Sequence, residues 1–215
     1  MAEAIRALPS GSTVVDVGGG RTCSFAGELE NGKNVRVVAV DVSPTELAAN
    51  TTADATLVAD VANRLPFADA ETDMVVSRTV LEHVPNVERA AHEMQRVLQA
   101  GGLSIHLLPC RYALFALVAR ILPFWLAKGV LHRLIPDSRG VVEFDVHYDR
   151  CHPAAIERLF RDAGFREVDV EYTWDQAAYF HAFFPVFLLV LAYQRIAEAL
   201  QLRILASYLI VRAQR

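Results

Sequence analysis

The sequence predicts an α/β fold in which helices cover both faces of a seven-stranded, mostly parallel sheet. Short apolar runs that end at a polar residue or at glycine recur through the first half of the chain, as expected of buried parallel strands. Residues 167–173 alternate between charged and apolar side chains, which is typical of a half-exposed strand. We expect strands at 13–17, 35–40, 56–59, 73–77, 103–108, 167–173 and 206–212, with one antiparallel strand near the C-terminus. Before the fifth strand we expect a helix at 87–99 that stops at Ala-Gly-Gly (100–102).

The most informative feature is the end of the first strand, where Asp16 precedes the consecutive glycines Gly18, Gly19 and Gly20. Glycines let the backbone turn sharply and let a ligand approach the main chain closely. Residues 22–30 are expected to form a helix whose first amides face that ligand. A turn of this kind at the carboxyl edge of an α/β sheet is where nucleotide-like cofactors bind.

A carboxylate at the end of the second strand strengthens this interpretation. Asp41 follows the strand 35–40 and lies 23 residues after Gly18. Ser43, directly before Pro44, is the better N-cap for a helix at 44–50, and this leaves Asp41 available for a ligand. An acid in this register accepts hydrogen bonds from both ribose hydroxyls of an adenosine group.

Further motifs follow in order along the chain. They are Asp-Val-Gly-Gly-Gly (16–20), Val-Asp-Val-Ser-Pro (40–44), Ala-Asp-Val (59–61), Leu-Pro-Phe (65–67), Asp-Met-Val-Val-Ser (73–77), Val-Leu-Glu-His-Val (80–84) and Arg-Val-Leu-Gln-Ala-Gly-Gly (96–102). In this order they resemble the class I S-adenosylmethionine-dependent methyltransferases, in the branch that includes quinone, sterol and small-molecule enzymes. The resemblance covers residues 10–110 closely and 145–172 more loosely, and it implies a Rossmann-like fold.

The resemblance implies S-adenosylmethionine as the cofactor and assigns a role to each matching position. Asp16 would organise the glycine turn and the methionine end of the cofactor, while Asp41 would bind the ribose. The remaining implied contacts are Gly18, Gly19 and Gly20 at the turn, Val42 on the adenine face, Asp60 and Val61 at the adenine edge, and Arg78 beside the methionine group. Thr22 stands where the family has a third glycine. Asp60 could instead be a plain turn residue, and Arg78 could be solvated.

Candidate catalytic residues are fewer. Quinone O-methyltransferases carry a Glu-Val-x-Glu-His run linked to metal-assisted deprotonation, but here the first carboxylate is replaced by Thr79. Two remaining ligands make a weak metal site, so no metal is expected. The simpler interpretation is that Glu82 and His83 fix their loop, although His83 could act as a base. In related enzymes the stretch 147–153 reaches the substrate side, where His147 and Tyr148 are candidate contacts.

Composition adds limits. The 215 residues suit one domain over 1–215, with a cofactor-binding half at 10–110 and a substrate half at 111–215. The net charge of −4 gives no reason to expect nucleic acid as a partner. Three scattered cysteines indicate neither a disulfide framework nor a zinc site and fit a reducing compartment. The N-terminus lacks the apolar core of a signal peptide, so a cytoplasmic location is expected.

Apolar residues crowd into two places in the C-terminal half, and we expect helical insertions near 111–135 and 177–203. Residues 176–194 contain no charged side chain, which approaches the length of a membrane span. Because the strands 167–173 and 206–212 should belong to one sheet, a single crossing between them would put sheet partners on opposite sides of the membrane. We expect Pro123 and Pro185 to interrupt these helices, which would pack on the sheet, roof the substrate pocket or lie in a membrane interface.

Together these features predict methyl transfer to a small, hydrophobic or lipid-linked acceptor by an enzyme that rests peripherally on a membrane. The apolar insertions carry aromatic and basic side chains suited to a lipid boundary: Phe115, Trp125, Phe180, Phe183, Phe184 and Phe187, with Arg111, Arg120, Lys128, Arg133 and Arg139. The same helices could instead pack on the sheet or form a homodimer. Two other functions stay open: a methyltransferase-like binding module without turnover, and a nucleotide-dependent reductase. The reductase fits less well because Cys23 occupies its last glycine position.

Overall fold

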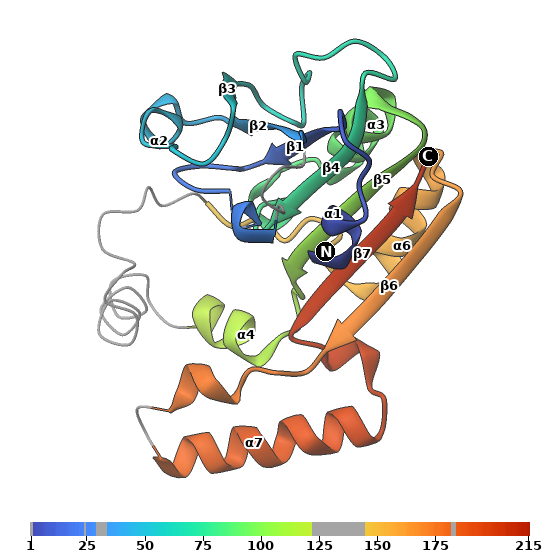
Figure 1. Cartoon of the computed structure of the whole chain (residues 1–215). Coiled ribbons are helices and arrows are strands. Elements are labelled where there is room, and N and C mark those ends of the chain that lie inside the picture. Colours follow the sequence, from blue (N-terminus) through green and yellow to red (C-terminus); the bar gives the residue numbers. More distant parts are fainter. Residues whose placement is uncertain (1, 24, 29–33, 122–144, 182–183) are drawn as a thin grey trace.

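A computed structural model describes residues 2–23, 25–28, 34–121, 145–181 and 184–215. These residues form one seven-stranded sheet with the strand order β3-β2-β1-β4-β5-β7-β6 (Figure 1). The strands are β1 (Thr13–Val17), β2 (Arg36–Asp41), β3 (Ala55–Val58), β4 (Thr72–Arg78), β5 (Leu98–Pro109), β6 (Glu167–Thr173) and β7 (Tyr208–Gln214). β7 pairs antiparallel with both β5 and β6, whereas the other pairings are parallel. The fold class expected from the sequence is confirmed.

Helices lie on both faces of the sheet. They are α1 (Ala2–Arg6), α2 (Pro44–Ala48), α3 (Val87–Val97), α4 (Leu114–Ile121), α6 (Pro153–Asp162) and α7 (Phe184–Ala199). The short 3-10 turns are η1 (Ala26–Glu28), η2 (Leu81–His83), η4 (Ala177–Phe180) and η5 (Arg203–Leu205). Ser43 caps α2 as expected, because its side chain accepts a hydrogen bond from the Glu46 amide. His152 and Pro153 begin α6, also as expected.

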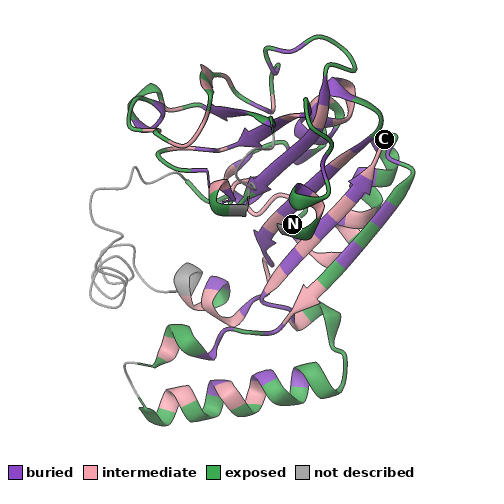
Figure 2. Cartoon of the chain, viewed as in Figure 1, coloured by how far each residue is buried: buried purple, intermediate pink, exposed green. Residues whose placement is uncertain are grey.

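The hydrophobic core has one part on each face of the sheet. The larger part joins apolar side chains of the strands to α3 and α6, with Met94 and Phe160 fully buried (Figure 2). The smaller part includes Ile5 of α1 and Phe25 on the opposite face. β6 is an edge strand of the sheet. It shows the expected alternation, since Val168 is buried while the charged residues beside it are exposed. Burial on both faces explains the continuous apolar runs of the central strands.

Two local expectations are wrong. The helix expected at 22–30 is not formed at residues 22 and 23, and only the short turn η1 follows over Ala26–Glu28. The helix expected at 87–99 ends at Val97, because Leu98 already pairs with Thr72 as the first residue of β5. The register then shifts between Thr72 and Met74, so the Ala-Gly-Gly segment forms an irregular part of β5 instead of a helix stop.

The apolar insertions are partly within the described residues. α4 represents the first, and residues 122–135, including Pro123, lie outside the described residues. η4 and α7 represent the second, as expected, but Pro185 falls in the first turn of α7 and does not interrupt it. In Figure 1, α7 lies beyond the end of the sheet. None of the described helices is both long and apolar enough to cross a bilayer.

One buried glutamine holds α7 against the segment before it. The Gln194 side chain accepts hydrogen bonds from the amides of Gln176 (3.0 Å) and Ala177 (3.1 Å), and it donates to Asp175 at 2.8 Å. The Trp174 indole also donates to the carbonyl of Leu202, just beyond the helix, at 3.1 Å. These bonds fix α7 to the end of β6 although much of its apolar surface stays exposed.

Candidate functional site

The glycine turn is built at the carboxyl ends of β1 and β2. The amides of Gly18 and Gly19 both donate to the Val40 carbonyl, at 2.7 and 3.3 Å, which draws the turn onto the neighbouring strand. Gly18 has φ +72°, and a Cβ there would stand 2.2 Å from a methyl carbon of Val80. This position therefore requires glycine both for its conformation and for its close contact with the segment after β4.

Polar side chains that the sequence analysis missed hold the turn in place. The Asn50 amide group donates to the carbonyls of Gly19 (3.2 Å) and Gly20 (2.8 Å), while its oxygen accepts from the amides of Thr52 (2.9 Å) and Ala53 (3.0 Å). No local sequence motif marks Asn50, because its role depends on the fold bringing the segment after α2 back to the glycine turn. Asn50 thus connects the two loops that carry the candidate cofactor residues.

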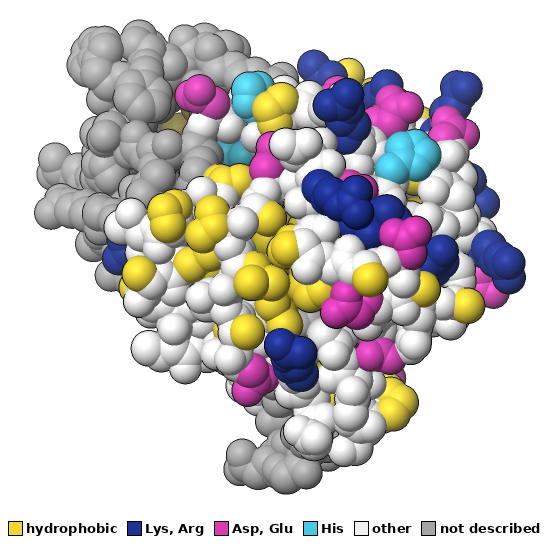
Figure 3. Space-filling model, turned by 90° about the horizontal axis from the view of Figure 1, so that it is seen from above, with side chains coloured by type: hydrophobic (Ala, Val, Ile, Leu, Met, Phe, Trp, Pro, Cys, Tyr) yellow, Lys and Arg dark blue, Asp and Glu magenta, His cyan; other side chains and the backbone are white. Residues whose placement is uncertain are grey.

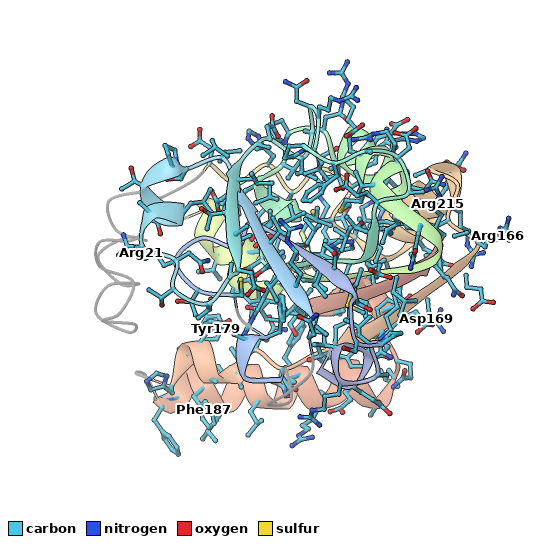
Figure 4. All side chains as sticks on the ribbon, turned by 45° about the horizontal axis from the view of Figure 1, so that its top comes forward. Arg21, Arg166, Asp169, Tyr179, Phe187 and Arg215 are labelled. Carbon is cyan, nitrogen blue, oxygen red and sulfur yellow. The ribbon has the colours of Figure 1, made fainter. Side chains whose placement is uncertain are left out.

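A charged clamp acts in parallel with Asn50. The Arg21 guanidinium donates two hydrogen bonds to the Glu46 carboxylate, at 2.7 and 2.9 Å. Glu46 is buried on α2, whereas Arg21 is exposed at the edge of the molecule, as Figure 4 shows. Bidentate pairs of this kind fix orientation as well as distance. The clamp ties the glycine turn to the helix that follows Asp41.

Asp41 faces the glycine turn from the end of β2. Its carboxylate accepts hydrogen bonds from the Gly20 amide at 3.2 Å and the Ser43 amide at 2.9 Å. The next residue, Val42, exposes 50 % of its surface. Figure 3 shows hydrophobic side chains gathered in the middle of the upper face, with charged side chains mostly to one side of them. Asp41 and Val42 hence present a carboxylate and an apolar surface next to each other.

Asp16 is buried beneath the turn with 4 % of its surface exposed. Its pKa is raised to about 7, mainly by desolvation and to a smaller extent by the nearby Asp41 charge, against the lowering effect of a hydrogen bond with Cys23. Removal from water disfavours the charged form of a carboxyl group. A cation bound at this turn would favour the ionised form of Asp16, so the group is poised to respond to a charged ligand near neutral pH.

The remaining residues expected to bind the cofactor differ in their surroundings. Asp60 is exposed, and its carboxylate accepts a hydrogen bond from the Ala62 amide at 2.9 Å, which is the geometry of a local turn. The Val61 side chain is buried in the core, so only its backbone could face an adenine. Arg78 ends β4 as an exposed side chain. Their roles toward a ligand stay predictions.

The candidate catalytic residues meet around η2. The Glu82 carbonyl accepts hydrogen bonds from the amides of His147 (2.8 Å) and Tyr148 (2.9 Å), which joins the loop after β4 to the segment before α6. The His83 ring is hydrogen-bonded to the Asp145 carbonyl at 3.0 Å. The structure thus brings His83, His147 and Tyr148 into one region, and their roles in catalysis stay predictions. The part of Glu82 that fixes the loop is its backbone, not its carboxyl group.

The Glu82 carboxyl group is the feature of this region that the sequence analysis undervalued. It is 4 % exposed, and its Oε2 atom has no hydrogen-bond partner among the described residues. Burial raises its pKa to about 8, with a smaller opposing effect from its own backbone amide. Buried polar atoms are nearly always paired, so an unpaired carboxyl oxygen indicates a functional group or an absent partner.

A second buried polar network lies inside the sheet. His106 of β5 is hydrogen-bonded through Nδ1 to Ser77 at 2.8 Å and through Nε2 to Ser104 at 2.6 Å, and its ring packs on Phe160 with 5.4 Å between centroids. Burial lowers the pKa of His106 to about 3, so the ring stays neutral. In the neutral ring one nitrogen donates and the other accepts, which both serine hydroxyls can match. This network is structural.

Other places on the molecule fit a site less well. One hollow of about 320 Å³ is lined by the start of β6 and the end of β7 together with Leu103 and Arg161, and another of about 430 Å³ lies along α6. Neither is lined by the glycine turn, Asp16 or Asp41, so we place the candidate site at the loops and not in these hollows. Within the described residues, no group of three or more His, Cys, Asp or Glu side chains is arranged to hold a metal ion.

The fold and the glycine turn define the class, a Rossmann-like protein with a candidate nucleotide-type cofactor site at the ends of β1 and β2. Comparison with known proteins then shows which family part of the chain resembles. Residues 15–106 match the family model described as "Methyltransferase domain". This match confirms the resemblance to class I methyltransferases read from the sequence, whose cofactor is S-adenosylmethionine.

Individual relatives cover parts of the chain. An uncharacterized methyltransferase of Mycobacterium sp. (strain JLS) is 38 % identical over 104 residues, which is 47 % of this chain and 40 % of that protein. The chloroplastic 2-methyl-6-phytyl-1,4-hydroquinone methyltransferase of Arabidopsis thaliana is 27 % identical over 165 residues, 74 % of this chain and 41 % of that protein. The chain therefore spans about two fifths of the length of these curated relatives.

A solved structure extends the similarity to the whole fold. The S-adenosylmethionine-dependent methyltransferase from Mesorhizobium loti aligns with a TM-score of 0.61 and 21 % identity, covering 100 % of this chain and 98 % of that one. At this identity the likeness concerns the fold. It supports the seven-stranded architecture around the residues that match the methyltransferase domain.

Proposed function

We propose that this protein transfers a methyl group from S-adenosylmethionine to a small acceptor. The observation that carries the proposal is the position of two carboxyl groups, the buried Asp16 and Asp41, at one glycine turn. This turn lies in the part of the chain that matches the methyltransferase domain. Asp41 and Val42 would hold the adenosine, with Asp60 and Val61 at the adenine edge. Asp16, Gly18–Gly20 and Arg78 would surround the methionine end.

Methyl transfer requires the protein mainly to position the acceptor and the cofactor. When bound, S-adenosylmethionine supplies an electrophilic methyl group on a sulfonium centre. The chain's own residues need to hold the acceptor in line with that methyl group and exclude water. η2 contacts the glycine turn through Val80, and the 145–151 segment is hydrogen-bonded to η2. His83, His147 and Tyr148 therefore lie on the acceptor side in this proposal.

We further propose that the acceptor is hydrophobic or lipid-linked, and that the enzyme docks peripherally on a membrane. Supporting this, α7 and the turn after it expose large apolar side chains: Phe184, Leu188, Leu189, Ile196, Leu200 and Ile204. Figure 4 shows Phe187 on the same helix, where it stacks on Phe184 with centroids 6.4 Å apart. Phe115, in contrast, packs on Tyr179 and Tyr208. Trp125 and Phe183 lie outside the described residues.

Turnover tests the enzymatic proposal directly. A cell lipid extract is incubated with the purified chain and S-adenosylmethionine, and mass spectrometry looks for a component that gains one methylene group. A heat-treated sample and the Asp41→Ala variant serve as controls. Cofactor binding without any methylated product would favour the alternative of a binding module that lacks turnover.

Liposome flotation tests the membrane part separately. With anionic vesicles, the wild-type chain should float, and replacement of Phe184 and Leu189 by Ser should reduce flotation severalfold. Replacement of the exposed α6 residue Ala154 by Ser is the matched control. If the wild type stays in solution and sedimentation shows a dimer that the Ser variant loses, the apolar face of α7 is a dimer interface instead.

A further inference from the structure

The loop after β4 places one unpaired carboxyl group on the acceptor side of the proposed site. Glu82 follows Val80, which touches Gly18, by two residues. Its carboxyl group is buried, its Oε1 lies 3.8 Å from the His83 ring, and its Oε2 finds no partner among the described residues. Among the described residues, the side chain therefore makes no hydrogen bond through Oε2 that would offset the desolvation of a buried carboxyl group.

The surroundings of Glu82 contain groups suited to an aromatic or apolar acceptor with a hydroxyl. The Tyr208 hydroxyl, hydrogen-bonded to that of Tyr179, lies within electrostatic range of Glu82. Phe115 packs on both tyrosine rings, at 5.0 and 5.5 Å between centroids. Figure 4 shows Tyr179 between α7 and the body of the sheet. Aromatic side chains of α4, η4 and β7 thus gather on the side of Tyr208 that Glu82 influences.

A cation stands in the same neighbourhood. Glu82 and Arg111 both act on the buried Cys151 thiol, the first raising its pKa and the second lowering it. The Arg111 amide donates to the Cys151 carbonyl at 2.7 Å, and its buried Nε atom has no partner among the described residues. A guanidinium here disfavours a cationic amine and stabilises an oxygen that loses a proton. These two orphaned groups therefore suit a neutral hydroxyl better than an ammonium.

We propose that Glu82 is the residue that receives the hydroxyl hydrogen bond of the methyl acceptor and takes its proton during transfer. This inference rests on the proposed function and adds to it the chemical class of the acceptor. The O–H bond breaks as its proton passes to Glu82 Oε2, and the acceptor oxygen forms a bond to the methyl carbon. The sulfur–methyl bond breaks with its electron pair remaining on sulfur, so the sulfonium becomes a neutral thioether.

Proton transfer by Glu82 has a consequence for pH. The groups that lie near the carboxyl are the His83 ring, the Tyr208 hydroxyl and the Cys151 thiol, and Arg111 acts on the same thiol. With its pKa raised to about 8, Glu82 holds a proton in much of the free protein at neutral pH. Turnover should rise with pH up to about 8 and then level off, because only the ionised carboxylate can accept a proton.

The test compares Glu82→Gln, Glu82→Leu and the exposed control Glu157→Gln, using para-octylphenol and para-octylaniline as matched probes. Calorimetry first measures S-adenosylhomocysteine binding to each protein, and then binding of each probe to the complex. We expect unchanged S-adenosylhomocysteine affinity throughout, preference for the phenol in the wild type, and at least tenfold weaker phenol binding in Glu82→Leu. Glu82→Gln should retain phenol binding, lose turnover about 100-fold and lose the rise with pH.

The outcomes separate the two proposals. If the wild type fails to bind S-adenosylhomocysteine, the proposed function is wrong. If it binds the cofactor product but prefers the aniline, or accepts neither probe, the assignment of a hydroxyl acceptor is wrong. If Glu82→Gln keeps both full turnover and the wild-type pH profile, Glu82 does not take the proton. Infrared titration of the carboxyl group in the cofactor-free protein adds a readout without turnover, since the phenol should shift a signal that Glu82→Gln lacks.

Discussion

Binding of the cofactor should release a proton from Asp16. The buried carboxyl group has its pKa raised to about 7, and the methionine end of the cofactor carries positive charge. Ionised Asp16 binds that charge, so cofactor affinity should follow the ionised fraction of the group. That fraction grows about tenfold between pH 6 and pH 8 for a pKa of 7, and the dissociation constant should fall by about the same factor. At pH 7, about half a proton should leave per cofactor bound.

Calorimetry in buffers of different ionisation enthalpy measures this proton count directly. The ligand is S-adenosylhomocysteine, whose amino group stays charged over this range of pH. Asp16→Asn should remove the proton release and flatten the pH dependence, while Asp162→Asn, an exposed α6 variant, should behave like the wild type. The reasoning is refuted if the wild type binds with no proton release, or if Asp16→Asn keeps the wild-type slope.

Three further predictions concern the framework of the site. Asn50→Ala should weaken S-adenosylhomocysteine binding at least tenfold by calorimetry, since the glycine turn loses two side-chain hydrogen bonds; an unchanged affinity would contradict the role of Asn50. Gly18→Ala should lower the free energy of unfolding by about 2–4 kcal/mol, because a Cβ there meets Val80 and φ is positive, whereas Gly27→Ala, with open space around it, should not. Because the pKa of His106 is lowered to about 3 by burial, its neutral form stabilises the fold above the unfolded pKa of 6.5, and this contribution is lost as pH falls. Between pH 6.5 and pH 5, the free energy of unfolding of the wild type, measured with urea, should fall by about 2 kcal/mol relative to that of His106→Asn. A difference between the two proteins that does not change with pH would refute the burial argument.

The strands were predictable from sequence because each combines an apolar run with a distinct stop. β1 and β6 have the expected bounds, and their ends are marked by the glycine turn and by the change of pattern after Thr173. β5 is longer than expected because Leu98 pairs with Thr72, a contact between residues 26 apart that no local signal reports. Local propensity favoured a helix at 22–30, but the Cys23 amide donates its hydrogen bond to the Thr52 side chain, a residue distant in the sequence.

The candidate site was predictable where function depends on a local motif. Asp16, Gly18 and Asp41 stand at strand ends, so the topology of a parallel sheet brings them together without further information. Asn50 and Glu82 could not be found in this way. Asn50 bonds to the glycine turn only because the chain folds back after α2. The Glu82 carbonyl accepts hydrogen bonds from a segment more than sixty positions later in the sequence. Contacts with residues distant in the sequence distinguish Asn50, and burial distinguishes Glu82.

The measurement that tests the central claim most directly is a calorimetric titration of the chain with S-adenosylhomocysteine, repeated for Asp41→Ala. Asp41 bonds to the backbone amides of Gly20 and Ser43 at the surface where the ribose is proposed to lie. The wild type should bind one equivalent, and Asp41→Ala should keep its fold by circular dichroism while its affinity falls by about 1.5–3 kcal/mol, the loss expected for a charge-assisted hydrogen bond. Absence of binding by the wild type, or equal affinity in the folded variant, would contradict the assignment of this turn as the cofactor site.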